Sequence, residues 1–82
     1  MTTINAGDFR RAAALITQHT SRDDTGCNAV LQEAAEAGRV TELILGILDV
    51  YETLTPLLHS PLGIAALRNI IADLARREEN EK

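Results

Sequence analysis

The residues that could bind a metal ion are few and widely spaced. His19, Cys27 and His59 carry the nitrogen and sulfur atoms that zinc prefers, and Asp23 or Asp24 could add an oxygen ligand. Their separations match none of the paired spacings of known zinc sites. Because Cys27 also falls on an apolar helix stripe, where a free thiol acts as a small hydrophobic side chain, we expect neither a metal ion nor a cofactor.

The polar segment 19–28 contains residue types found in two other kinds of site. His19, Ser21 and Asp23 are the types of a hydrolase triad, but neighbours in one loop rarely converge as a triad requires. The aspartates lack the alternating oxygen ligands and distal glutamate of a calcium-binding loop. Capping of the following helix explains them better, so the sequence predicts a protein that is not an enzyme.

Charge and aromatic content disfavour nucleic acid as a partner. The net charge is −4, and the two adjacent cation pairs, Arg10/Arg11 and Arg76/Arg77, lie among carboxylates or near the chain end. Binding to phosphates depends on clustered basic residues, which release counterions. Only two residues are aromatic, Phe9 and Tyr51, which is too few to form a stacking platform for single strands.

Length and cysteine content limit the class of protein. Eighty-two residues are too few for separate hydrophobic cores, so we expect one helical domain over 1–82. A lone Cys27 cannot form an internal disulfide, which fits a reducing cytoplasm. The first residues show no export signal, and the strongest apolar run, 43–48, is much shorter than a membrane span. We therefore expect a soluble cytoplasmic protein with no membrane partner.

Apolar residues recur every three or four positions without sustained alternation, which predicts an all-α fold. The expected architecture is a small bundle of about four helices, approximately 6–19, 25–37, 40–55 and 61–76, with a frayed tail from about residue 77. In the first helix the predicted apolar face consists of Phe9, Ala12, Ala13 and Ile16, broadened by Leu15.

Helix boundaries follow from capping residues and from proline. The candidate N-caps are Asn5 for the first helix, Asp23, Asp24 or Thr25 for the second, and Ser60, before Pro61, for the last. Gly38 is expected to turn an αα-hairpin, because glycine adopts the left-handed conformation at helix ends without strain. Pro56 either ends or kinks the third helix by about Thr55.

The third helix carries an apolar arc of roughly 160°, wider than one neighbouring helix covers. Since a chain this short has little core to stabilise it, we predict a non-enzymatic protein–protein interaction module that self-associates, as a homodimer or other homo-oligomer, or that docks on another protein. The predicted interface residues are Leu43, Ile44, Ile47, Leu48, Tyr51 and Leu54, and Leu67, Ile70 and Leu74 are further candidates. The same residues could instead fill a four-helix core.

The main alternative is a small helix-turn-helix regulator that binds nucleic acid. Residues 27–37, Gly38 and residues 40–54 form the required helix, turn and helix. A recognition helix presents polar and basic groups to the groove. The helix that would take this role, residues 40–54, is instead broadly apolar and carries acidic residues on its outer side. On this alternative the DNA contacts would be Arg10, Arg11 and Arg22.

Overall fold

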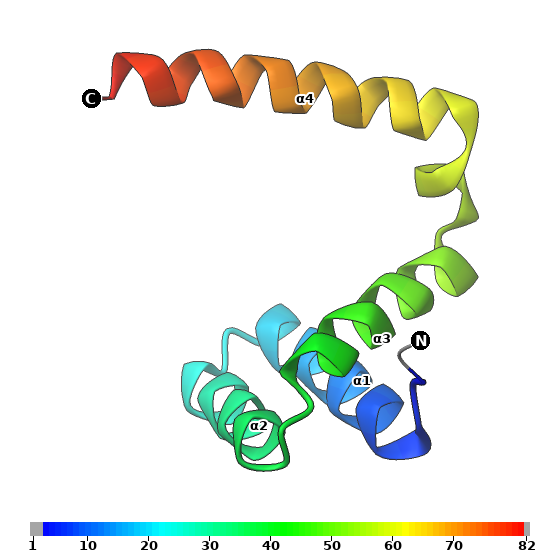
Figure 1. Ribbon diagram of the computed structural model, residues 1–82, viewed down its shortest axis with the longest axis vertical. Helices are drawn as coiled ribbons and strands as arrows, with labels where there is room; N and C mark the ends of the chain where they lie inside the picture. Colours follow the sequence, from blue (N-terminus) through cyan, green and yellow to red (C-terminus); the bar gives the residue numbers. More distant parts are fainter. Residues whose placement is uncertain (1–2, 82) are drawn as a thin grey trace. The chain divides into compact units, whose positions relative to one another are not determined.

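Four α-helices and one short 3-10 helix make up most of residues 3–81, the part of the chain that the computed structural model describes (Figure 1). In chain order they are α1 (Ala6–Thr20), α2 (Asp24–Glu36), α3 (Val40–Leu54), η1 (Pro56–His59) and α4 (Pro61–Asn80). The described residues form no strand, so the predicted all-α fold is confirmed. The first three helices begin and end within one residue of their predicted bounds.

The last helix continues to Asn80, where the sequence suggested a frayed tail from about residue 77. The apolar periodicity stops at Leu74, but charged pairs extend the helix beyond it. Asp73 forms ion pairs with Arg76 at 3.4 Å and with Arg77 at 3.0 Å. Pairs at these spacings stabilise a helix without any buried face, and a count of apolar positions does not detect them.

Local side-chain caps begin three of the helices where the sequence placed them. Asn5 and Asp8 form a reciprocal capping box at the start of α1, in which each side chain accepts a hydrogen bond from the other residue's backbone N–H at 2.9 Å. Asp23 accepts from Gly26 N–H at 2.9 Å, and Ser60 Oγ accepts from Gly63 N–H at 3.2 Å. These bonds satisfy amide groups that lack partners within the helix.

The predicted hairpin turn at Gly38 is present and has a defined geometry. Gly38 has φ of 69°, and Arg39 N–H donates to Ala34 O at 2.8 Å while Gly38 N–H donates to Ala35 O at 3.1 Å. These two bonds define a Schellman motif, which closes the end of α2 and directs the chain into α3.

The chain divides into two compact units, Met1–Tyr51 and Glu52–Lys82, and the boundary falls in the last turn of α3. In the first unit, α1, α2 and α3 lie together (Figure 1). They pack around Ala12, Ala34 and Leu43, which are almost fully buried. Gly46 lies on the buried side of α3, and a Cβ there would be in ordinary van der Waals contact with Asp8 O at 3.4 Å and with Ala12 Cβ at 3.5 Å, so α3 packs directly against α1 at this position. The single domain expected from the length stays a prediction.

In the second unit Pro56 ends α3, and the chain continues as the short helix η1 before α4 begins. The residues of η1 lie against the first turn of α4. Gly63 makes this packing possible, since a Cβ at that position would collide with the carbonyl oxygens of Leu57 and Leu58. The sequence left open whether Pro56 ends or kinks the helix, and the structure shows that the helix ends.

Candidate interaction surface

The outer side of α3 carries a row of large apolar side chains that the first unit leaves exposed. Ile44 is 53% exposed and Leu48 is 49% exposed, and Val40 and Tyr51 lie on the same side at 43% and 41%. The opposite side of α3 contributes Leu43 and Gly46 to the interior. We call Val40, Ile44, Leu48 and Tyr51 the α3 stripe. Its spacing of four, four and three residues keeps it on one face of the helix.

The six predicted interface residues therefore occupy three different environments. Leu43 is 1% exposed and belongs to the core, and Ile47 packs against that core. Ile44, Leu48 and Tyr51 lie on the α3 stripe. Leu54 is exposed in the second unit. The wide apolar arc of the sequence thus combines a buried face and an exposed face of one helix.

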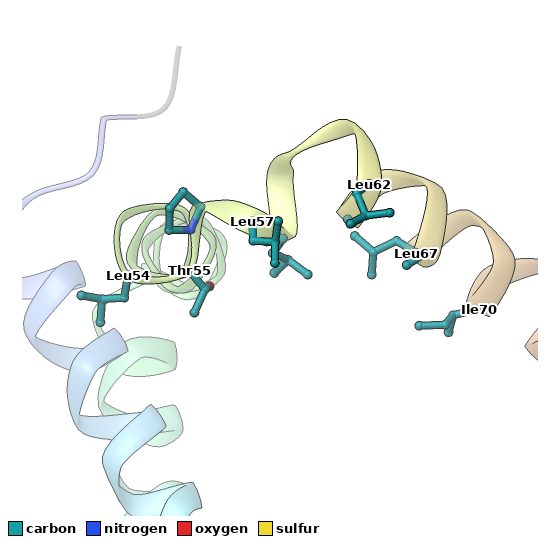
Figure 2. A pocket seen from close by; sticks show the side chains of 10 residues that line it. Leu54, Thr55, Leu57, Leu62, Leu67 and Ile70 are labelled. Atoms are coloured by element: carbon teal, nitrogen blue, oxygen red, sulfur yellow. The ribbon is translucent and has the colours of Figure 1, made fainter.

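The second unit contains an open apolar groove between the end of α3, η1 and the start of α4 (Figure 2). Its volume is about 640 Å³. The residues that line it are Leu54, Thr55, Pro56, Leu57, Leu58, Leu62, Gly63, Ala66, Leu67 and Ile70. No residue of α4 is buried, so this unit presents its hydrophobic side chains to the outside.

A network of charged residues lies inside the first unit, and the sequence did not reveal it. The Asp8 side chain is fully buried and Arg11 is 8% exposed. Asp8 Oδ2 accepts from Arg39 Nη2 at 2.6 Å, and Asp8 Oδ1 accepts from Arg11 Nη2 at 3.1 Å. Arg11 also donates to Glu33 at 3.1 Å, and Arg39 donates to the Thr3 carbonyl at 2.8 Å. The network joins α1, α2 and the start of α3.

The electrostatics of this network indicate a structural role. The hydrogen bond from Arg39 is the main reason that the pKa of Asp8 lies well below its usual range, with further lowering by Asn5 N–H and Arg11 against the opposing effect of burial. Hydrogen bonds from Arg10 and then Arg11 likewise lower the pKa of Glu33. Carboxylates held ionised and occupied by donors are poor general bases, so the network orients helices.

This network also involves two of the three arginines that the nucleic-acid alternative would use. Arg10 and Arg11 both form ion pairs with Glu33. Their charges are thereby offset within the first unit, which weakens any basic surface on α1.

Two of the residues considered as metal ligands line one hollow in the first unit. His19 and Cys27 contribute to a pocket of about 340 Å³, whose other lining residues are Leu15, Ile16, Thr20, Ile47 and Tyr51. His59 belongs to η1 in the second unit, and Asp23 caps α2. Within residues 3–81, no three histidine, cysteine or acidic side chains gather as metal ligands would.

None of the helices within residues 3–81 combines the length and the apolar character that a membrane span requires. No known protein family, curated protein or solved structure matches this chain.

Proposed function

We propose that this protein is a non-enzymatic interaction module that associates with further copies of itself through the α3 stripe. The observation that carries the proposal is the exposure of Ile44 and Leu48, each about half accessible, on a helix whose other side already forms the core. An apolar row of this kind is stabilised when a second apolar surface covers it.

The small size of the core supports association. The hydrophobic residues of the described chain that are buried are Ala12, Val30, Ala34 and Leu43, and two of these are alanines. A core of this size contributes little to the free energy of folding, so small domains often gain their remaining stability from oligomerisation. Closed homo-oligomers are the commonest solution, because one self-complementary surface serves both subunits.

The test is the replacement Leu48→Glu. Leu48 is half exposed within its own unit, so the substitution leaves the core intact, but it places a charge in the proposed interface. We expect the solution mass measured by light scattering to fall by half while the helix content measured by circular dichroism is retained.

The matched control is Ala29→Glu, which adds the same charge at an exposed position of α2. It should leave the mass unchanged. An unaltered mass for Leu48→Glu, or an equal loss of mass for Ala29→Glu, would remove the proposal.

A further inference from the structure

The hollow that contains His19 and Cys27 has the composition of a small-molecule site. It lies within the first unit, where the last turns of α1, the first turn of α2 and the second half of α3 meet. Its volume of about 340 Å³ falls in the range of about 300–1000 Å³ that is usual for such sites. Sites of this kind are mostly apolar and contain a few polar groups that orient the ligand. This hollow has both, and we call it the Cys27 pocket.

The partly buried side chains of the Cys27 pocket are apolar. Leu15 and Ile47 also pack against the core of the first unit, and Ile16 and Cys27 are half-buried. Among the described residues that line the pocket there is no aspartate, glutamate, lysine or arginine. An ionic ligand would lose its hydration there without gaining a partner of opposite charge, so the chemistry of the lining selects a neutral ligand.

The exposed side chains of the pocket are polar or aromatic and form its rim. They belong to His19, Thr20 and Tyr51. The Thr20 hydroxyl donates its hydrogen to Ile16 O at 2.9 Å, so its oxygen can only accept a further hydrogen bond. A ligand group that binds Thr20 must therefore be a donor. The rings of His19 and Tyr51 favour an aromatic ligand, because aromatic rings attract one another in offset-stacked or edge-to-face arrangements.

We propose that the Cys27 pocket binds a small neutral aromatic molecule that carries one hydroxyl or N–H group. The aromatic body lies against Leu15, Ile16 and Ile47, and the polar group faces the rim, where it donates a hydrogen bond to Thr20 Oγ1. Burial of the aromatic body supplies most of the affinity. The hydrogen bond to Thr20 adds a preference for ligands that can donate. This binding requires no second copy, so it goes beyond self-association through the α3 stripe.

The hydrogen bond is tested with two probes and the full-length protein. The probe 2-naphthol has a rigid aromatic body and one hydroxyl, and 2-methoxynaphthalene has the same ring system but cannot donate. Their affinities are measured from the fluorescence of the naphthalene ring during titration. We expect Thr20→Val to weaken the binding of 2-naphthol by roughly three- to tenfold, the effect of one neutral hydrogen bond. The affinity for 2-methoxynaphthalene should not change.

The matched control is Thr17→Val. Thr17 lies on the same helix, and its hydroxyl donates to the carbonyl oxygen four residues earlier at 2.8 Å, as that of Thr20 does. Thr17 is not among the residues that line the pocket, so this variant should bind both probes as the wild type does. An equal loss of 2-naphthol affinity in both variants, or no loss in Thr20→Val, contradicts the proposal.

The position of the ligand is tested at Cys27, the one cysteine of the chain. Because Cys27 lines the pocket, the rate at which iodoacetamide alkylates it, followed by intact mass, reports whether the pocket is occupied. We expect 2-naphthol to slow the alkylation in proportion to the fraction of protein that is bound. If 2-naphthol binds without protecting Cys27, it binds elsewhere, for example in the groove of the second unit, and the proposal is wrong.

Tyr51 belongs both to the rim of the pocket and to the α3 stripe, so the titration and the protection assay are repeated with Leu48→Glu. Leu48 does not line the pocket. Binding of 2-naphthol with protection of Cys27 in this variant supports the pocket, whatever the solution mass of the variant is. The absence of binding in both the wild type and Leu48→Glu overturns the pocket. It leaves self-association through the α3 stripe unaffected, because that proposal is tested by the solution mass alone.

Discussion

Asp8 shows how a charged residue can lie inside a very small protein. Four donors surround its carboxylate, namely two nitrogens of Arg39, one of Arg11 and the backbone N–H of Asn5. A buried charge is costly unless it is paired and hydrogen-bonded, and here each of the four bonds is donated by a guanidinium group or by the N-cap amide of α1. The same carboxylate caps α1 and holds the start of α3, so its contribution extends over two helices.

The depressed pKa of Asp8 makes the stability of the protein depend on pH. An unfolded aspartate has a pKa of about 3.9, and Arg39 chiefly lowers that of the folded state. The stabilisation is therefore complete above about pH 4 and is lost progressively as the pH falls toward the folded pKa. We expect the urea midpoint of the wild type to decline between about pH 4 and pH 2.

Asp8→Asn is the control for this assignment. The amide has nearly the same size but cannot pair with Arg39, so the variant should be less stable than the wild type at pH 7. It should also lose less stability on acidification, because the residue no longer takes up a proton. If the difference between the two proteins were the same at pH 7 and pH 2.5, the pairing of Asp8 would not be the source of the pH dependence.

The ends of α1 and α2 use the same hydrogen-bonding motif with different residues in its left-handed position. Gly38 occupies that position after α2, whereas after α1 it is Arg22, with φ of 58°. Arg22 N–H donates to His19 O at 3.1 Å and Asp23 N–H donates to Gln18 O at 2.9 Å, the same two bonds as at Gly38. A side chain with a Cβ is strained in this conformation, and glycine is not.

Introducing glycine at position 22 and removing it at position 38 should therefore change the stability of the protein in opposite directions. We expect Arg22→Gly to raise the free energy of unfolding by about 0.5 kcal/mol and Gly38→Ala to lower it by about 1 kcal/mol, as measured by urea unfolding. A Cβ at position 38 meets no atom within 4 Å, so the second effect comes from the backbone alone. Arg22→Ala serves as the control and should give no gain. A gain equal to that of Arg22→Gly would attribute the effect to the arginine side chain.

The elements that could be predicted from the sequence are those fixed by neighbouring residues. The caps at Asn5, Asp23 and Ser60 and the turn at Gly38 each depend on a few consecutive positions. The buried face of α1 depends on contacts with distant residues. It contains Asp8, Arg11 and Ala12, whereas the apolar pattern predicted a face that included Phe9 and Ala13, both of which are exposed.

The candidate surface could be predicted only in part, because it too depends on contacts between residues that are distant in the sequence. The width of the arc on the third helix indicated apolar residues beyond what one neighbour covers, and Ile44 and Leu48 are indeed exposed. The pattern could not show that Leu43 belongs to the core, because two adjacent faces of one helix look alike until its neighbours are placed. The groove beside Leu57 and Gly63 depends on η1 folding against α4, which no periodicity reports.

At the scale of the whole molecule, self-association makes the stability of the folded protein depend on its concentration. Subunits that stabilise each other by covering the α3 stripe unfold together with dissociation, so mass action opposes unfolding more strongly in concentrated solution. A tenfold rise in concentration contributes about 1.4 kcal/mol for each association step. For an assembly of about 150–250 residues, this raises Tm by roughly 3–5 °C.

We therefore expect the Tm of the wild type, measured by circular dichroism, to increase by roughly 3–5 °C for each tenfold rise in protein concentration. Each chain carries a net charge of −4, so salt that screens repulsion between copies should raise Tm further. Nucleic-acid binding would respond in the opposite way, because salt weakens contacts with phosphates. The Leu48→Glu protein is the control, and its Tm should not change with concentration. A wild-type Tm that is equally constant would mean that the monomer accounts for all of the stability and that another copy does not cover the α3 stripe.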